Sequence, residues 1–143
     1  MHTPPPALTE LPSWLLAQVT LQAGRIVSEA LAEEGVRRHH YTVLLTLSEQ
    51  GSSQADLGRR LGIDRSDLHA VLNDLEGDDL VARVRDEEDR RRNVVELTTK
   101  GATILKRLAV KVEEAQDALL RPLSKSERAV FNRILKILLD HHR

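Results

Sequence analysis

The sequence predicts a mainly α-helical protein with one small β-hairpin. Apolar residues recur with helical spacing through most of the 143 residues, but between Leu80 and Leu97 the spacing changes to strand-like alternation. A highly charged stretch separates the two alternating segments; within RVRDEEDRRRNVVEL at 83–97, four consecutive acids lie between arginines. We therefore expect this stretch to contain the loop of a hairpin.

Composition limits the classes of protein that this chain can belong to. Its length suits one domain, 1–143, and 41% hydrophobic with 30% charged residues fits a globular protein. The absence of cysteine excludes disulfides, thiolate ligands and thiol redox sensing. No apolar run approaches the roughly 18 residues of a membrane helix, and no secretory signal begins the chain, so we expect a cytoplasmic protein. A net charge of −1 means that any affinity for nucleic acid must come from a local patch.

The first third of the chain predicts an arm and two helices. Three consecutive prolines within residues 1–12 indicate an extended arm. Apolar residues over 13–32 follow the spacing of a long amphipathic helix, which Gly35 ends. Residues 41–47 form a second, short apolar helix before Gly51.

Two closely spaced start signals then predict a helix-turn-helix. Ser53 to Asp56 has the form of a capping box, and Gly62 ends the helix that it opens. Asp64 opens the next helix, whose core-facing residues are expected at Leu68, Val71, Leu72 and Leu75. Two short helices joined by a tight turn are typical of this motif.

A hairpin directly after this motif completes the layout of a winged helix-turn-helix. We expect Leu80, Ala82 and Val84 on one face of its first strand, and Val95 and Leu97 on the inner face of its second. Thr98 would cap the next helix, which extends to about residue 120, and Ser124 to Glu127 is a second capping box. The terminal helices are more apolar than a lone winged helix needs. We therefore expect 37–100 to form the winged helix-turn-helix, and 1–35 and 102–143 to form dimerisation helices.

The second helix of the motif would present short polar side chains on its outer face. A rotation of about 100° per residue places Ser66, His69, Ala70 and Asn73 opposite the leucines. Side chains of these types can contact base edges in a DNA major groove. The alternative is an ordinary solvated helix face.

The charged hairpin favours the DNA interpretation. An arginine at the tip of a β-ribbon can enter the minor groove, and Arg90, Arg91 and Arg92 are candidates. The neighbouring acids would repel DNA unless one of them, such as Asp89, pairs with a guanidinium and fixes its direction. The alternative is a solvated hairpin whose surface ion pairs contribute little energy.

The run from Leu57 to Gly101 resembles the core of the MarR (multiple antibiotic resistance regulator) family. It contains a leucine-spaced helix-turn-helix, then LV-x-R, D-x-x-D-R-R and L-T-x-x-G. The resemblance implies a transcriptional regulator, with repression expected, that binds double-stranded DNA as a homodimer at a near-palindromic site. It also implies a minor-groove role for Arg91, positioned by Asp89, and a phosphate or wing contact for Arg90. The full candidate set for DNA contact is Gln54, Arg65, Ser66, Asp67, His69, Ala70, Asn73, Asp89, Arg90 and Arg91.

Two positions depart from the family pattern. Many members have a basic residue where this chain has Ala70, which implies a missing or displaced DNA contact. Members also often have glycine directly before the Leu80-Val81 pair, where this chain has Asp79, so the turn into the hairpin is expected to differ in shape.

The resemblance further implies a small aromatic or anionic effector, bound between the dimerisation helices and the winged helix. Trp14, Arg25, His39 and Tyr41 are candidate wall residues because they lie on the first two helices. The alternative is core packing for Trp14 and Tyr41 and solvated surface for the other two.

Other functional classes have weaker support. The histidine pairs His39-His40 and His141-His142 lack the i, i+4 spacing of helix chelation, although ligands could assemble across a dimer in a metal-responsive regulator. No triad or phosphate-binding loop is present, so we expect no enzyme and no cofactor. A winged helix that binds another protein remains an alternative, but such a protein would not need three arginines beside Asp89.

Overall fold

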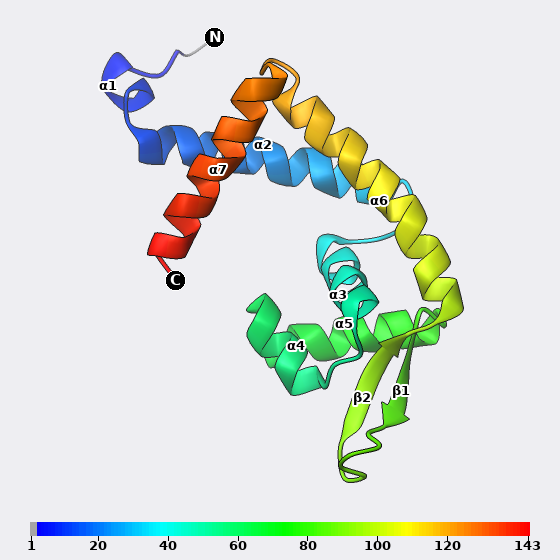
Figure 1. Cartoon of the computed structure of the whole chain (residues 1–143). Coiled ribbons are helices and arrows are strands. Elements are labelled where there is room, and N and C mark those ends of the chain that lie inside the picture. Colours follow the sequence, from blue (N-terminus) through cyan, green and yellow to red (C-terminus); the bar gives the residue numbers. More distant parts are fainter. Residues whose placement is uncertain (1–2) are drawn as a thin grey trace. The chain divides into compact units, whose positions relative to one another are not determined.

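The computed structural model describes residues 3–143 and confirms the predicted fold class: helices with one two-stranded antiparallel sheet. The elements are, in chain order, α1 (Pro6–Thr9), α2 (Pro12–Ala32), α3 (Arg38–Glu49), α4 (Gln54–Leu61), α5 (Arg65–Gly77), β1 (Val81–Arg85), β2 (Asn93–Leu97), α6 (Thr99–Leu120) and α7 (Lys125–His141), as labelled in Figure 1. Among residues 3–143, no helix has the length and apolarity needed to cross a membrane.

The chain forms two compact units. One contains the chain up to Ile26 together with Glu113–Arg143, and the other is Val27–Val112. The long helices α2 and α6 therefore each contribute to both units. The winged helix-turn-helix lies entirely within the second unit.

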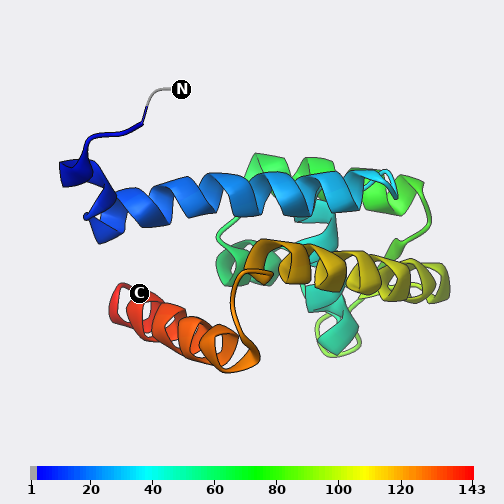
Figure 2. The ribbon, with the colours of Figure 1, turned by 90° about the horizontal axis from the view of Figure 1, so that it is seen from above.

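Leucine and valine side chains from almost every element of the second unit form its core. Leu31, Leu44, Leu57, Leu72 and Leu108 are completely buried. Each such burial contributes about 1.5–3 kcal/mol relative to an exposed side chain. The end of α2 and the middle of α6 lie side by side in Figure 2. The two residues that follow α2 bond to α6 at the surface: Arg107 donates to Glu34 at 2.7 Å and Lys111 to Glu33 at 2.8 Å.

The helix-turn-helix begins and ends at the predicted residues. The Ser53 side chain accepts a hydrogen bond from the backbone N–H of Asp56, and Gly62 ends α4 in the left-handed conformation with φ 63°. Asp64 caps α5 by accepting from the backbone N–H of Ser66. The side chains predicted to face the core are all buried, namely Leu68, Val71, Leu72 and Leu75.

The hairpin forms as predicted, but its first strand begins one residue later than expected. Val81 pairs with Leu97 and Arg83 with Val95, so the inner face of β1 carries Val81. Ala82 and Val84 share one face of β1, as predicted, but Leu80 lies outside the strand, which begins at Val81. Leu80 is buried in the preceding turn, where its N–H donates to the carbonyl of Leu75.

Two tight contacts join the hairpin to its neighbours. Asp79 has φ 59°, a left-handed conformation in which glycine is favoured, and its carbonyl accepts from Thr98 Oγ1 at 2.6 Å. Thr98 also caps α6, as predicted, by accepting from the N–H of Gly101. A Cβ atom at buried Gly101 would lie well inside contact distance of the Leu80 carbonyl, so only glycine fits there.

In the first unit, the proline-rich segment is partly helical, which corrects the prediction of an extended arm. Pro6 occupies the first turn of α1, where a missing N–H costs no hydrogen bond. The predicted capping box of α7 is present between Ser124 and Glu127. Arg128 joins α7 to α6 through Asp117 at 2.7 Å.

Large apolar side chains remain exposed in this first unit. They lie within residues 8–21 and on α7, and Ile137, for example, is 55% exposed. We call this set the exposed terminal residues: Leu8, Leu11, Leu15, Leu16, Val19, Leu21, Val130, Ile134, Ile137, Leu138 and Leu139.

Candidate nucleic-acid interface

The outer face of α5 is exposed, as its helical spacing predicts. Ser66, Asp67, His69, Ala70 and Asn73 all lie on the surface, opposite the buried leucines. The face therefore presents hydroxyl, carboxylate, imidazole, methyl and amide groups to solvent. Such groups suit contacts with base edges and thymine methyl groups.

The cap at the start of α5 also orients Ser66. Asp64 accepts from the backbone N–H of Ser66 at 3.1 Å and from its hydroxyl at 2.5 Å. Both hydrogen bonds lower the pKa of Asp64 below its ordinary value, and the bond from the Ser66 hydroxyl has the larger effect. The capping carboxylate therefore stays charged at neutral pH. The Ser66 hydroxyl is thereby held in one direction, with its oxygen available as an acceptor.

An open groove between α4 and α5 brings four of the predicted contact residues together. Its floor is apolar and includes Ala55, Ile63 and Leu68. Its polar lining contains Gln54, Arg65, Ser66 and His69, and it also contains Arg59, which the sequence prediction missed. The Arg59 side chain is 75% exposed and pairs with Asp56 one turn earlier. The adjacent Arg59-Arg60 pair in the first helix of the motif was the signal that would have found it.

Asn73 lies at the other end of the face, beside the hairpin. Its side-chain oxygen accepts from Arg83 of β1 at 3.5 Å, and Arg83 also donates to Glu76 at 2.7 Å. Arg83 therefore links the second half of α5 to the base of the hairpin.

The tip of the hairpin carries the predicted pair of charges. Asp89 accepts from the backbone N–H of Arg91 at 3.1 Å, and the Arg91 guanidinium lies 3.5 Å from the same carboxylate oxygen. Arg91 is nevertheless 95% exposed, so the guanidinium is oriented without being buried. Arg90 is also exposed.

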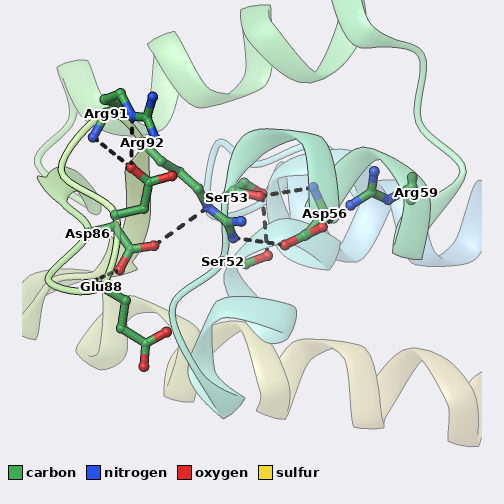
Figure 3. A network of polar contacts seen from close by, with 9 residues as sticks. Ser52, Ser53, Asp56, Arg59, Asp86, Glu88, Arg91 and Arg92 are labelled. Atoms are coloured by element: carbon green, nitrogen blue, oxygen red, sulfur yellow. Dashed lines mark hydrogen bonds and ion pairs between the residues drawn. The ribbon is translucent and has the colours of Figure 1, made fainter.

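Arg92 differs from its two neighbours. Its guanidinium lies 3.2 Å from Asp56 on α4 and 3.6 Å from Asp86 at the start of the loop (Figure 3). Of the three candidates for insertion into a groove, Arg92 is thus the one that faces the protein.

The four candidate effector residues are divided between the two units. Trp14, which is partly buried, and exposed Arg25, which donates to Gln22 at 2.7 Å, belong to the first unit. Tyr41 and exposed His39 belong to the second. Tyr41 packs against the core, and burial raises the pKa of its hydroxyl. This environment suits the packing alternative for Tyr41.

The other histidine of the pair has a defined partner. His40 Nε2 lies 3.1 Å from an Asp74 carboxylate oxygen on α5, in a groove that Arg37 and Leu80 also line. Over residues 3–143, no group of three or more histidine or acidic side chains is placed to hold a metal ion.

The arrangement of these elements defines a class of protein. A capped helix with an exposed polar face, followed by a hairpin with an outward arginine, is a winged helix-turn-helix of the DNA-binding type. Residues 34–92 match the MarR family, and the chain is similar to this family of transcriptional regulators.

Comparisons with individual proteins agree with this assignment. The chain is 25% identical over 134 residues to the transcriptional repressor NicR of Pseudomonas putida, covering 93% of this chain and 85% of NicR. A mutant of Escherichia coli MarR complexed with operator DNA is similar in structure, with a TM-score of 0.77, 25% identity, and coverage of 87% of this chain and 91% of that one. BpsR of Bordetella bronchiseptica, solved in a study of how 6-hydroxynicotinic acid regulates its DNA binding, has the same fold at 22% identity, with a TM-score of 0.83 and coverage of 96% and 99%.

Proposed function

We propose that the protein is a homodimeric, sequence-specific repressor that binds a near-palindromic operator. In this proposal the outer face of α5 enters the major groove and Arg91 enters the adjacent minor groove. The observation that carries it is the pairing of an exposed polar helix face with a 95% exposed, carboxylate-oriented arginine within one compact unit. A regulator of this kind acts on the chromosome, so we expect a cytoplasmic location and no enzymatic activity.

The contacts divide into two kinds. Ser66, His69 and Asn73 would contact bases, whereas Arg59, Arg65 and Arg90 would contact phosphates and set the register on the duplex. Ala70 offers only a methyl group, which suits a thymine methyl and supplies no charge. Because the net charge is −1, non-specific affinity should be modest, and binding should depend strongly on the correct site.

The exposed terminal residues support the homodimer. Monomeric proteins rarely leave apolar side chains of this size exposed along two helices. A second copy would cover them and would place two recognition helices on one face of the duplex, which a near-palindromic site requires.

We also propose regulation by a small aromatic or anionic molecule, as 6-hydroxynicotinic acid regulates BpsR. Such a molecule would change DNA affinity only if it prefers one arrangement of the recognition helices over another. The absence of cysteine is a reason to propose ligand control rather than thiol oxidation.

Fluorescence anisotropy against a duplex from the intergenic DNA next to the protein's own gene tests the proposal. We expect saturable binding that unrelated DNA competes with poorly and that weakens as salt increases. Binding no tighter than to unrelated DNA, at this duplex and in a genome-wide selection for bound DNA, would instead favour the protein-interaction alternative.

The minor-groove role predicts the effect of Arg91→Ala. Specific affinity should fall by about 1–3 kcal/mol, the scale of one good groove contact, with the fold unchanged. Lys106→Ala is the matched control, because it removes the same charge from an exposed position on α6. If the two variants bound DNA with equal affinity, Arg91 would not be part of the DNA interface.

A further inference from the structure

The backbone of Arg92 closes the hairpin loop, and its side chain extends out of the loop toward α4. The backbone N–H of Asp86 donates to the Arg92 carbonyl at 2.9 Å, and the Arg92 N–H donates to the Asp89 carbonyl at 3.1 Å. From this fixed backbone the guanidinium reaches Asp56 on α4 and Asp86 in the loop, as Figure 3 shows. Inserting Arg92 into DNA would break both ion pairs.

Asp56 is a firmly held partner. It lies in the first turn of α4, where its N–H is bonded to Ser53 and where the helix dipole favours a negative charge. Hydrogen bonds from the Ser53 and Arg59 side chains, followed by the charges of Arg59 and Arg92, lower its pKa. Asp56 therefore remains ionised at neutral pH and is anchored to the helix-turn-helix.

The ion pair between Arg92 and Asp56 joins the hairpin loop to α4, and few other contacts connect these two segments. Near its base, β2 is held by two backbone hydrogen bonds between Ser52 and Val95, at 3.0 and 2.8 Å. Beyond that point, among the hydrogen bonds and ion pairs described for residues 85–93, only the contact of Arg92 with Asp56 reaches α4. Without it, the loop would be free to tilt about its base.

We propose that Arg92 is a positioning residue that fixes the inclination of the hairpin relative to α4, and thereby sets where Arg91 meets the DNA. This inference rests on the proposed DNA-binding function. Arg91 directly precedes Arg92 in the chain, and its side chain pairs with Asp89 of the same loop. The direction of Arg91 relative to α5 therefore depends on the contact between Arg92 and Asp56.

Whether Asp56→Asn strengthens or weakens DNA binding distinguishes a positioning role of Arg92 from direct attraction to phosphates. If Arg92 only attracted phosphates, Asp56→Asn would strengthen binding, because it removes a negative charge and frees the guanidinium. If Asp56 holds Arg92 in place, Asp56→Asn should weaken specific binding. We expect Arg92→Gln and Asp56→Asn each to weaken binding to the intergenic duplex about two- to fivefold, the range for an exposed ion pair.

A double-mutant cycle gives the coupling. The double variant Arg92→Gln/Asp56→Asn should bind DNA with the affinity of either single variant, because both substitutions remove the same contact. If the two residues acted independently, the fold-losses in affinity would multiply. Arg92→Lys should recover part of the affinity. The salt dependence of Arg92→Gln should match that of the wild type, since loss of a phosphate contact would reduce the slope by about 1. Arg85→Gln is the control for loss of one charge from the same hairpin.

A spectroscopic distance measures the hairpin without DNA. The chain has no cysteine, so Glu87→Cys in the loop and Ala55→Cys on α4, both exposed, can carry spin labels in protein diluted with unlabelled chains. Arg92→Gln should broaden the distance distribution, and Arg85→Gln should leave it unchanged.

The outcomes distinguish the two proposals. An unchanged distribution, stronger binding by Asp56→Asn, or additive losses in the cycle would overturn the positioning role while leaving DNA binding intact. If Arg92→Gln broadens the distribution but the wild-type protein binds no DNA specifically, the proposed function would be overturned, and with it the role of Arg92 in directing Arg91.

Discussion

At the scale of single residues, Asp79 occupies a conformation that its side chain opposes. A left-handed backbone costs a residue with a Cβ about 1–2 kcal/mol, although aspartate tolerates it better than most. Resemblance to the MarR family indicated glycine at this position, and φ 59° gives the physical reason. The turn into the hairpin is therefore made here under mild strain.

Asp79→Gly should stabilise the protein by about 0.5–1 kcal/mol, because the strain is removed at a modest cost in unfolded-chain entropy. Chemical denaturation measures this change. Asp78→Gly is the matched control, since Asp78 has φ −90° and gains nothing from glycine. A loss of stability in Asp79→Gly would mean that the aspartate side chain itself stabilises the turn.

The roles of the three neighbouring arginines could be predicted only in part. The sequence indicated that one of them would be paired with Asp89, and Arg91 has that contact. The partner of Arg92 lies 36 positions away, on α4, so no local pattern could reveal it. Long-range ion pairs of this kind depend on tertiary structure, which spacing does not encode.

At the scale of elements, the helices were the more predictable part. Capping residues and apolar spacing located α4, α5 and the start of α7 because these signals are local. The beginning of β1 was mispredicted by one residue, because Leu80 is apolar and fits the alternation although it lies in the preceding turn. The turn at Asp79 moved that beginning to Val81.

The contact between α6 and α7 should make stability depend on pH. The Arg128 hydrogen bond, followed by its charge, lowers the pKa of Asp117. A carboxylate with a lowered pKa in the folded state stabilises the fold above its unfolded pKa, near 3.9, and the stabilisation is lost as the pH falls through the folded value.

Asp117→Asn should therefore lower the melting temperature at pH 7, and the difference from the wild type should disappear as the pH falls through the lowered pKa of the folded state. Thermal unfolding over a pH series checks this, and high salt should shrink the difference at pH 7 by screening. A difference that stayed constant across the series would show that the Asn variant is destabilised by packing rather than by charge.

At the scale of the whole molecule, the two units differ in how completely they bury their large apolar side chains. The second has a closed core of fully buried leucines, whereas the first leaves leucines and isoleucines of α2 and α7 exposed. A chain that retained such a surface as a monomer would tend to aggregate. The proposed homodimer explains why this surface is apolar.

Leu15→Glu should weaken self-association at least tenfold, because burying an unpaired carboxylate at an apolar interface costs more than about 1.4 kcal/mol. Gln18→Glu is the control, as it adds the same charge to an exposed polar position of α2. Sedimentation equilibrium measures both. A wild-type protein that sediments as a stable monomer would contradict the dimer and the palindromic site together.

Gly101 has a consequence for how the protein can vary. The Leu80 carbonyl lies so close that even the methyl group of alanine has no room. In a saturation library selected only for folded protein, we expect this codon to accept glycine alone, whereas codons for the outer face of α5 should accept many substitutions. Substitutions on α5 could then change operator preference without loss of the fold. Gly101, which packs against the residue that precedes the hairpin, would not change.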